Sequence, residues 1–93
     1  MSRYRVEFLE QVHPQLARLP QSIKHRMLER ITNLEDDPRP RGSRALHGRL
    51  AGRRRLRVGD YRALYVVNDD QRLVTVVSAG HRRHVYDDAE RGA

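Results

Sequence analysis

The chain has 93 residues, 38% of them hydrophobic, and this length predicts a single domain spanning residues 1–93. It contains no cysteine, which excludes disulfides and thiolate metal sites and favours a reducing, cytoplasmic location. No apolar run approaches the roughly 18 residues that a membrane span needs, and the polar start, MSRYRVEFLEQ, argues against a signal peptide.

The basic residues are concentrated in one part of the chain. There are 19 basic and 12 acidic residues, which gives a net charge of +7, and 18 of the basic residues are arginine. Nine arginines but only one acid, Asp60, lie between Arg39 and Arg62, whereas the rest of the chain is near neutral. Guanidinium groups bind phosphate through two parallel hydrogen bonds, so we expect a nucleic-acid partner. A solvated basic surface and an acidic protein partner are the alternatives.

The N-terminal half predicts one strand and two helices. Polar and apolar residues alternate over residues 3–8, which is typical of a strand. Apolar residues follow at helical spacing in 9–19, where Pro14 fits only the first turn of a helix that begins near His13. The next segment, 21–35, predicts an amphipathic helix with one apolar face, made by Ile23, Met27, Ile31 and Leu34.

The C-terminal half predicts an antiparallel meander. Strands at 55–58 and 61–67 flank Gly59-Asp60, and a third strand at 72–79 follows a turn at 68–71 and ends at Gly80. The two-residue loop would pair Arg57 with Arg62, and the four-residue turn would pair Arg62 with Val77. We therefore expect an α+β fold, in which an N-terminal strand and a three-stranded antiparallel meander form a mixed-order sheet with two helices on one face.

The paired arginines predict a phosphate clamp on one face of the sheet. Like charges directly opposite each other destabilise a sheet, and such a pair suggests an anion between them, although side chains that fan into water are the alternative. The hairpin and the segment after the third strand should meet at one edge. This edge would bring together Arg55, Arg57, Arg62, His81, Arg82 and Tyr86.

RNA can be cleaved by such a set without a metal or a cofactor. When the neighbouring 2′-hydroxyl attacks the phosphate, cations must neutralise the phosphorane and another group must move protons. Arginine is a poor base, so the proton transfer would fall to His81, His84 or Tyr86. The His81-x-x-His84 spacing lacks an evident third ligand, and we therefore expect no metal site.

Two motifs carry a resemblance to a known family. The sequences LRVGDYRALY at 56–65 and GHRRHVY at 80–86 resemble the RelE/ParE superfamily of bacterial type II toxins. The stretches LARLP at 16–20, LEDDPRP at 34–40 and ALHG at 45–48 agree with it. The resemblance covers about residues 4–87, nearly the whole chain.

The resemblance implies a RelE-like fold and a RelE-type mRNA interferase. Such a toxin is a ribosome-dependent endoribonuclease that enters the A site, contacts rRNA and cuts mRNA by 2′-hydroxyl attack, leaving a cyclic phosphate and a 5′-hydroxyl. The resemblance also implies a cognate acidic, RelB-like antitoxin, through which any contact with operator DNA would be indirect. ParE-type toxins share the fold but poison DNA gyrase, and they are the alternative. A non-catalytic basic module that binds RNA or DNA is the third interpretation.

The family motifs also imply roles for individual residues. The strand arginine falls on Arg62, the later arginine on Arg82 and the tyrosine on Tyr86. Two strand lysines of the family fall on Arg55 and Arg57, which departs from the pattern and makes His81 or Tyr86 the expected base. We therefore expect catalysis by Arg62, Arg82, Tyr86 and His81, and RNA binding by Arg53, Arg55, Arg57, Arg83 and His84.

Overall fold

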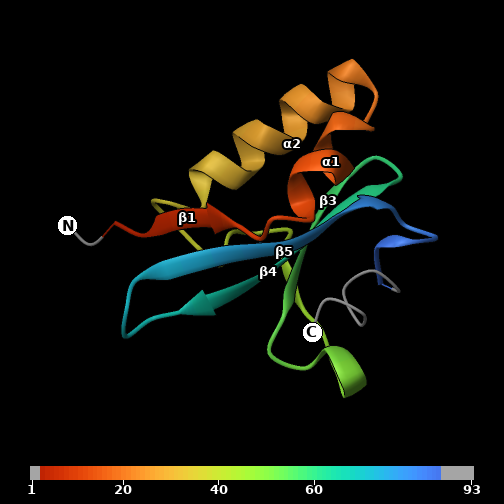
Figure 1. The fold of residues 1–93 in the computed structure, drawn as a ribbon. Helices are drawn as coiled ribbons and strands as arrows, with labels where there is room; N and C mark the ends of the chain where they lie inside the picture. Colours follow the sequence, from red (N-terminus) through yellow and green to blue (C-terminus); the bar gives the residue numbers. More distant parts are fainter. Residues whose placement is uncertain (1–2, 87–93) are drawn as a thin grey trace.

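The computed structural model describes residues 3–86, which form a helix-covered sheet (Figure 1). In chain order the elements are β1 (Arg5–Phe8), α1 (Val12–Ala17), α2 (Gln21–Asn33), β2 (Arg44–Ala45), the 3-10 helix η1 (Gly48–Leu50), β3 (Arg54–Val58), β4 (Tyr61–Asn68) and β5 (Leu73–His81). No helix in this part of the chain has the length and apolar character needed to cross a membrane.

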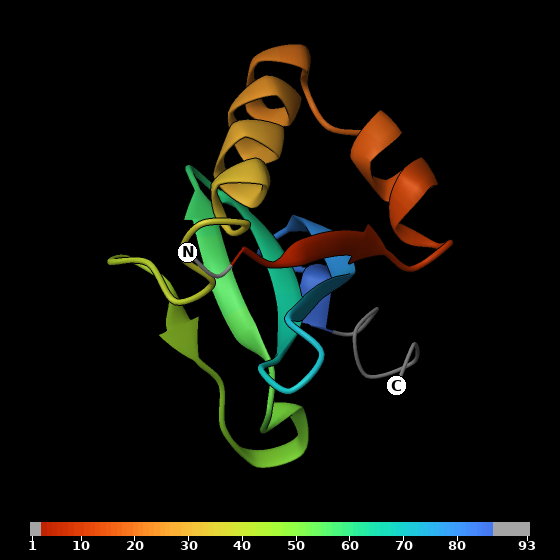
Figure 2. The same cartoon turned by 90° about the vertical axis from the view of Figure 1, so that its left-hand side faces the viewer.

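All five strands belong to one sheet, in the order β1-β5-β4-β3-β2. β1 runs parallel to β5, and the other neighbours are antiparallel. Helices α1 and α2 lie on the same face of the sheet, whereas η1 lies on the other side (Figures 1 and 2). The expected α+β fold with helices on one face is therefore confirmed.

Prolines fix where both helices begin. Pro14 is the third residue of α1, where backbone N–H groups have no acceptor within the helix, so its missing N–H costs nothing. Pro20 immediately precedes α2 with a φ of −53° and an extended ψ. The helix ends at Asn33, two residues before the predicted end, and it buries Met27 and Ile31 against the sheet.

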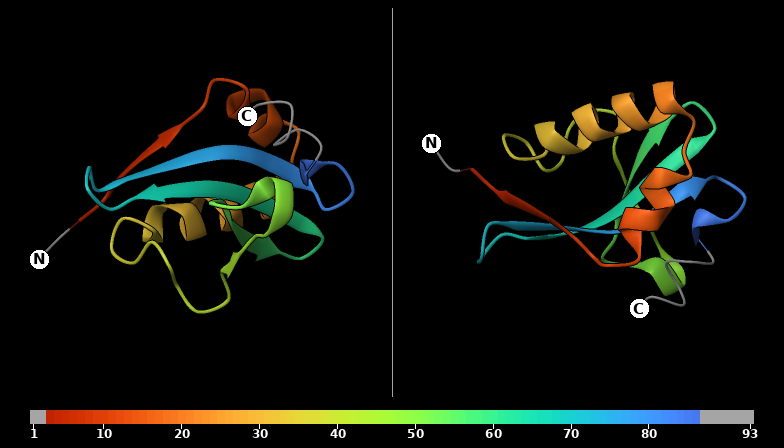
Figure 3. Two further views of the ribbon diagram at one scale, coloured as in Figure 1. Left: turned by 90° about the horizontal axis from the view of Figure 1, so that it is seen from below. Right: turned by 45° about the horizontal axis from the view of Figure 1, so that its top comes forward.

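Apolar side chains gather on both faces of the sheet. The main core lies on the helix side and joins both helices to alternate positions of the strands, among them Leu56, Val58, Ala63 and Tyr65. A smaller cluster on the other side contains Leu50, Leu64 and Val85. This second cluster attaches η1 and the segment after β5 to the face opposite α1 and α2. In the view from below, η1 lies in front of the sheet (Figure 3).

The predicted register between the last two strands is wrong. The structure pairs Arg62 with Gly80, not with Val77, and β5 continues through Gly80 to His81. One cause is the turn, because Asn68 still pairs with Leu73 and Arg72 adopts a positive φ of 52°. The other is a β-bulge, in which the register skips Val77 between the pairs Tyr65–Val76 and Leu64–Ser78.

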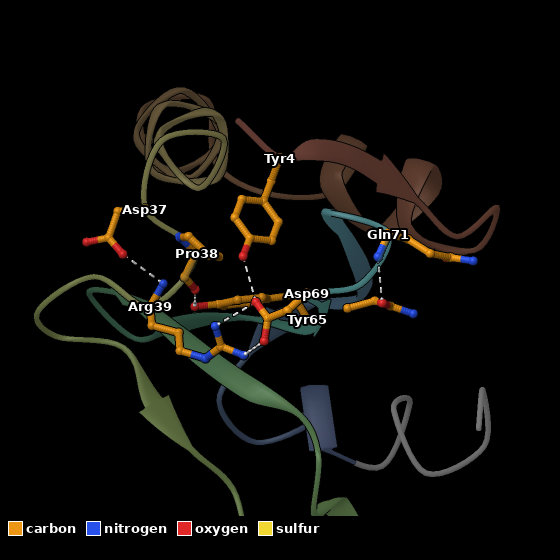
Figure 4. Close-up of polar contacts among 8 residues, drawn as sticks. Tyr4, Asp37, Pro38, Arg39, Tyr65, Asp69 and Gln71 are labelled. Carbon is orange, nitrogen blue, oxygen red and sulfur yellow. Dashed lines mark hydrogen bonds and ion pairs between the residues drawn. The ribbon is translucent and has the colours of Figure 1, made fainter. Parts of the chain in front are cut away.

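A polar network joins the N-terminus to the β4–β5 turn (Figure 4). The Asp69 carboxylate accepts hydrogen bonds from the Tyr4 hydroxyl at 2.6 Å and from two guanidinium nitrogens of Arg39 at 3.1 and 2.9 Å. Beside it, the buried Tyr65 hydroxyl donates to the Pro38 carbonyl at 2.8 Å. These contacts fix the loop after α2 against the sheet.

Candidate active site

Two pairs of arginines stand opposite each other on the face of the sheet opposite α1 and α2. Arg57 pairs with Arg62, as predicted, and Arg44 on β2 pairs with Arg55. Directly paired residues point to the same face, and alternate residues of a strand do so too. We call these four arginines the basic face.

Arg62 is held in place by backbone carbonyls and not by an acid. The residue is only 7% exposed, and its Nη1 donates to the carbonyls of Gly59 at 2.8 Å and Tyr61 at 3.0 Å. The Nε of Arg62 is buried and has no hydrogen-bond partner within residues 3–86. Burial lowers the pKa of this guanidinium, the charge of Arg57 lowers it further, and the neighbouring Tyr86 hydroxyl raises it in part.

Gly59 shapes the turn that carries these contacts. Its φ of +59° lies in the left-handed region, which glycine enters without steric cost. The same carbonyl that accepts from Arg62 also lies 3.4 Å from the Nε of Arg57. A single backbone oxygen therefore holds two like-charged side chains side by side.

Tyr86 comes to the basic face from the segment after β5. Its hydroxyl accepts a hydrogen bond of 3.4 Å from the Nη1 of Arg55. The preceding residue, Val85, is fully buried, and its carbonyl accepts a 3.1 Å hydrogen bond from the buried Ser78 hydroxyl. Side chains from β3, β4 and the C-terminal segment therefore meet at one place, formed by Arg55, Arg62 and Tyr86.

The structure places His81 differently from the other expected catalytic residues. His81 pairs directly with Tyr61, and the two rings meet edge to face with centroids 5.4 Å apart. Because Tyr61 packs against the core on the helix side, alternation puts His81 on the face opposite Arg62. Its Nδ1 accepts the backbone N–H of Arg83 at 3.2 Å.

The remaining predicted residues lie around this centre. The backbone N–H of Arg82 donates to the Asp60 carbonyl at 2.9 Å, which anchors Arg82 beside the β3–β4 turn. Arg82, Arg83 and His84 are exposed, and none of their side chains makes a hydrogen bond or ion pair within the described chain. Arg53 directly precedes β3 and is half-buried.

Two residues near the site were missed by sequence reasoning. Arg44 lies in a strand of only two residues, too short to produce an alternating pattern. Arg30 on α2 donates from Nη1 to the Arg57 carbonyl at 2.9 Å. The short strand β2 does not extend as far as Arg57, so this carbonyl lies on an edge of β3 that has no neighbouring strand. No local signal in the sequence connects Arg30 to the sheet.

The basic face has no acidic partner in the part of the chain described. The ion pairs found within residues 3–86 involve Arg3, Arg5 and Arg39. None of them involves the four arginines of the basic face. The same residues, 3–86, contain no group of three histidines or acids that could hold a metal ion. This arrangement suits an anion that arrives from outside the chain.

Comparison with known proteins identifies the family. The model of the ParE toxin of the type II toxin–antitoxin system parDE matches residues 6–86. The chain therefore belongs to this family and is a type II toxin of the RelE/ParE superfamily, as its motifs indicated. A comparison with curated proteins found no significant match.

Solved structures agree with this assignment. The chain is similar to one in a RelBE toxin–antitoxin complex from Mycobacterium tuberculosis, with a TM-score of 0.75 and 31% identity over 86% of this chain and 99% of that one. A RelE–RelB complex from Pyrococcus horikoshii OT3 gives a TM-score of 0.74 and 34% identity, covering 88% and 97%. A mutant of the free Escherichia coli toxin RelE shares the fold, with a TM-score of 0.72 and 23% identity over 98% and 97%.

Proposed function

We propose that this toxin is a ribosome-dependent endoribonuclease that cleaves mRNA by attack of the neighbouring 2′-hydroxyl. The observation that carries the proposal is the meeting of Arg55, Arg62 and Tyr86 from three separate parts of the chain. The two relatives above 30% identity are in complexes named for RelB and RelE, which supports a RelE-type activity. No metal or cofactor is part of the proposed reaction.

The arginines would stabilise the charge that develops during cleavage. Attack forms a bond between the 2′-oxygen and phosphorus and breaks the bond to the 5′-oxygen, through a phosphorane with additional negative charge. Fixed cations stabilise such a transition state best when they need no reorganisation. Arg62 meets this condition, because two carbonyls and its burial hold the guanidinium in one position. Arg55 and Arg57 lie next to it and would bind the same phosphate.

Tyr86 is our first candidate for proton transfer. The 2′-hydroxyl must lose a proton and the leaving 5′-oxygen must gain one, and a side-chain hydroxyl at the cationic centre can exchange protons with either. His81 is the second candidate. Its ring lies on the helix side of the sheet and its Nδ1 is already hydrogen-bonded, which favours Tyr86.

The exposed basic residues around the centre would bind the rest of the RNA. Arg82, Arg83 and His84 follow β5 at the hairpin end of the sheet, and Arg53 lies at the start of β3. In the proposed complex Arg82 also contacts the reacting phosphate. These residues would contact the mRNA and the surrounding rRNA mainly through phosphates, because the few aromatic residues of the chain provide little surface for base stacking.

We also propose that an acidic, RelB-like antitoxin silences the toxin. Two related toxins are seen in complexes with RelB proteins, and the charge of +7 on this chain suits an acidic partner. Direct electrostatic blocking requires that the antitoxin cover the basic face. Contact with operator DNA would be made by the antitoxin.

The test is cleavage of a defined mRNA on ribosomes with an empty A site. Wild type is compared with Arg62→Gln, Tyr86→Phe and a control, Arg18→Gln, whose side chain is exposed at the end of α1. We expect fragments that end in a cyclic phosphate, rates lowered roughly 100-fold by each site variant, and no change in the control. A wild-type toxin that arrests growth while leaving mRNA intact, on and off the ribosome, would show that the proposal is wrong.

Gyrase poisoning is the competing function. The matching family model is named for the ParE toxin, and this name favours a gyrase target. A supercoiling assay with purified gyrase separates the two functions. Inhibition by wild type and by Tyr86→Phe alike, without RNA cleavage, would establish the gyrase target in place of the RNA.

A further inference from the structure

A second group of arginines surrounds a cavity at the outer edge of the sheet. The cavity has a volume of about 170 Å³, several times the roughly 30 Å³ that a water molecule occupies in the liquid. It lies between β2, the start of β3 and the end of β4. Its lining residues are Arg39, Ala45, Gly52, Arg53, Arg54 and Val67.

Two arginines that line the cavity carry hydrogen-bond donors that the described chain does not use. The Nε atoms of Arg53 and Arg54 are buried and have no acceptor within residues 3–86. Arg54 donates only from Nη2, to the Ser43 hydroxyl at 2.9 Å. Arg39 is held rigidly, because Asp69 accepts from both of its terminal nitrogens (Figure 4). Asp69 neutralises one of the three guanidinium charges, which leaves an excess of positive charge around the cavity.

The cavity is connected to the basic face by a row of arginines. Arg53, Arg55 and Arg57 occupy alternate positions at and just before β3, and alternate residues of a strand lie about 6.6 Å apart on one face. This spacing is close to that of successive phosphates in an extended nucleic-acid strand. Arg54 alternates to the helix side, so the cavity receives arginines from both sides of the sheet edge.

We propose that this cavity is a phosphate subsite for the RNA strand, a few nucleotides away from the scissile phosphate. The inference rests on the proposed ribonuclease function and adds to it a second, non-catalytic contact. The strand would run from Arg57 along β3 to the sheet edge. There Arg54 and Arg53 bind a backbone phosphate by hydrogen bonds, and Arg39, held by Asp69, forms part of the cavity wall. The subsite would give affinity and orientation, and it would take no part in proton transfer.

The test compares short and long RNA. The ligands are a trinucleotide and an octanucleotide with 2′-O-methyl groups, which cannot be cleaved by 2′-hydroxyl attack. We measure their binding to wild type, Arg54→Gln, Arg54→Lys and the control Arg18→Gln. We expect Arg54→Gln to weaken octanucleotide binding roughly tenfold and trinucleotide binding hardly at all, as for the loss of a charged hydrogen-bonded contact. Arg54→Lys, which keeps the charge without the planar fork, should lose only part of this affinity.

A scan of the wild type gives a measurement that does not depend on the folding of variants. One linkage at a time in the octanucleotide is replaced by an uncharged methylphosphonate. A single distant linkage whose replacement weakens binding about as much as Arg54→Gln supports the subsite, whereas an even, small effect at every linkage contradicts it.

Other outcomes would overturn the subsite in distinguishable ways. Equal loss of affinity for both RNA lengths means that Arg54 acts on the whole fold or on the catalytic centre. If Arg54→Gln weakens binding of a polyglutamate peptide and leaves RNA binding unchanged, the cavity receives an acidic protein segment instead. A wild type that binds neither RNA overturns the subsite, whereas the proposed ribonuclease function is tested separately by cleavage of mRNA on ribosomes.

Discussion

Arg57 and Arg62 face each other across the β3–β4 hairpin, and the carbonyl of Gly59 lies within 3.4 Å of both guanidinium groups. Two like charges in this position destabilise the folded chain, because an acidic partner in residues 3–86 does not offset them. A bound phosphate would remove the repulsion. The arginine pair therefore lowers the stability of the free toxin and favours the binding of an anion.

Replacement of Arg57 should separate stability from function. We expect Arg57→Gln to raise the melting temperature by about 2 °C, because the repulsion at a cross-strand pair disappears, and to weaken RNA binding. Thermal unfolding and RNA titration on the same preparation check this, with Arg18→Gln as the control. A lower melting temperature together with unchanged RNA affinity would mean that the pair does not clamp phosphate.

Tyr86 and His81 can be distinguished by their kinetics. We expect Tyr86→Phe to lower the cleavage rate by about 100-fold and to leave RNA affinity nearly unchanged, since the ring and its packing remain. His81→Asn should lower the rate by less than about tenfold, because the imidazole lies on the helix side. The measurement is single-turnover cleavage of ribosome-bound mRNA, and the reverse order of the two effects would assign the proton transfer to His81.

The convergence of Arg55, Arg57 and Arg62 was predictable because a two-residue loop and strand alternation determine it. The placement of His81 was not predictable, because the sequence pattern predicts a third strand that ends at Ala79 and leaves His81 outside the sheet. In the structure β5 includes His81, and its direct pairing with Tyr61 fixes its face. Strand register also predicted that Arg55 and Tyr86 lie at one edge, whereas the hydrogen bond between them depends on the packing of the last segment, which no local pattern reveals.

At the scale of elements, the segment after β5 is the one on which catalysis should depend. Its attachment to the sheet includes the fully buried Val85 and the hydrogen bond from Ser78 on β5 to the Val85 carbonyl. The bulge at Val77 matters here, because it puts Ser78 opposite Leu64, on the side of the small second core. Sequence patterns gave no sign of this bulge, which together with the turn made the predicted register wrong.

Removal of the Ser78 hydroxyl should loosen this attachment. We expect Ser78→Ala to cost about 1 kcal/mol of stability, as for a buried hydrogen bond whose acceptor is left unpartnered, and to slow cleavage more than it weakens RNA binding. Thr75→Ala, also on β5 and without a side-chain hydrogen bond in the described chain, is the matched control. Unfolding in urea and single-turnover cleavage measure the two effects, and equal cleavage rates in both variants would contradict the role of the segment.

The strand β2 shows a second limit of sequence patterns at this scale. Its two residues follow a loop with Gly42 at a φ of +94°, and pairing with β3 alone defines it as a strand. The helices were predictable because their apolar spacing and flanking prolines are local signals. The sheet order, with β1 parallel to β5 at its edge, comes from packing of the whole chain.

At the scale of the whole molecule, the Tyr4–Asp69–Arg39 network joins the N-terminal end of the described chain and the loop after α2 to the β4–β5 turn. The Arg39 guanidinium and then the Tyr4 hydroxyl lower the pKa of Asp69 from 3.8 to about 2. Because the folded-state pKa is the lower one, the stability that this carboxylate contributes is present above about pH 4 and is lost as the pH falls toward 2.

Acid titration of a variant tests this network. We expect Asp69→Asn to have a lower melting temperature than wild type at neutral pH and a smaller difference from it as the pH approaches 2. Thermal unfolding monitored by circular dichroism at a series of pH values measures the difference. A difference that stays constant over the whole range would mean that ionised Asp69 does not stabilise the fold.

The most direct test of the proposed site is a double-mutant cycle in single-turnover cleavage of ribosome-bound mRNA. Wild type, Arg62→Gln, Tyr86→Phe and the double variant are compared at saturating toxin. If both side chains act on one phosphodiester as a unit, the double variant should cleave hardly more slowly than the slower single variant. Rate losses that simply multiply would show that Arg62 and Tyr86 act independently, contrary to a single catalytic centre.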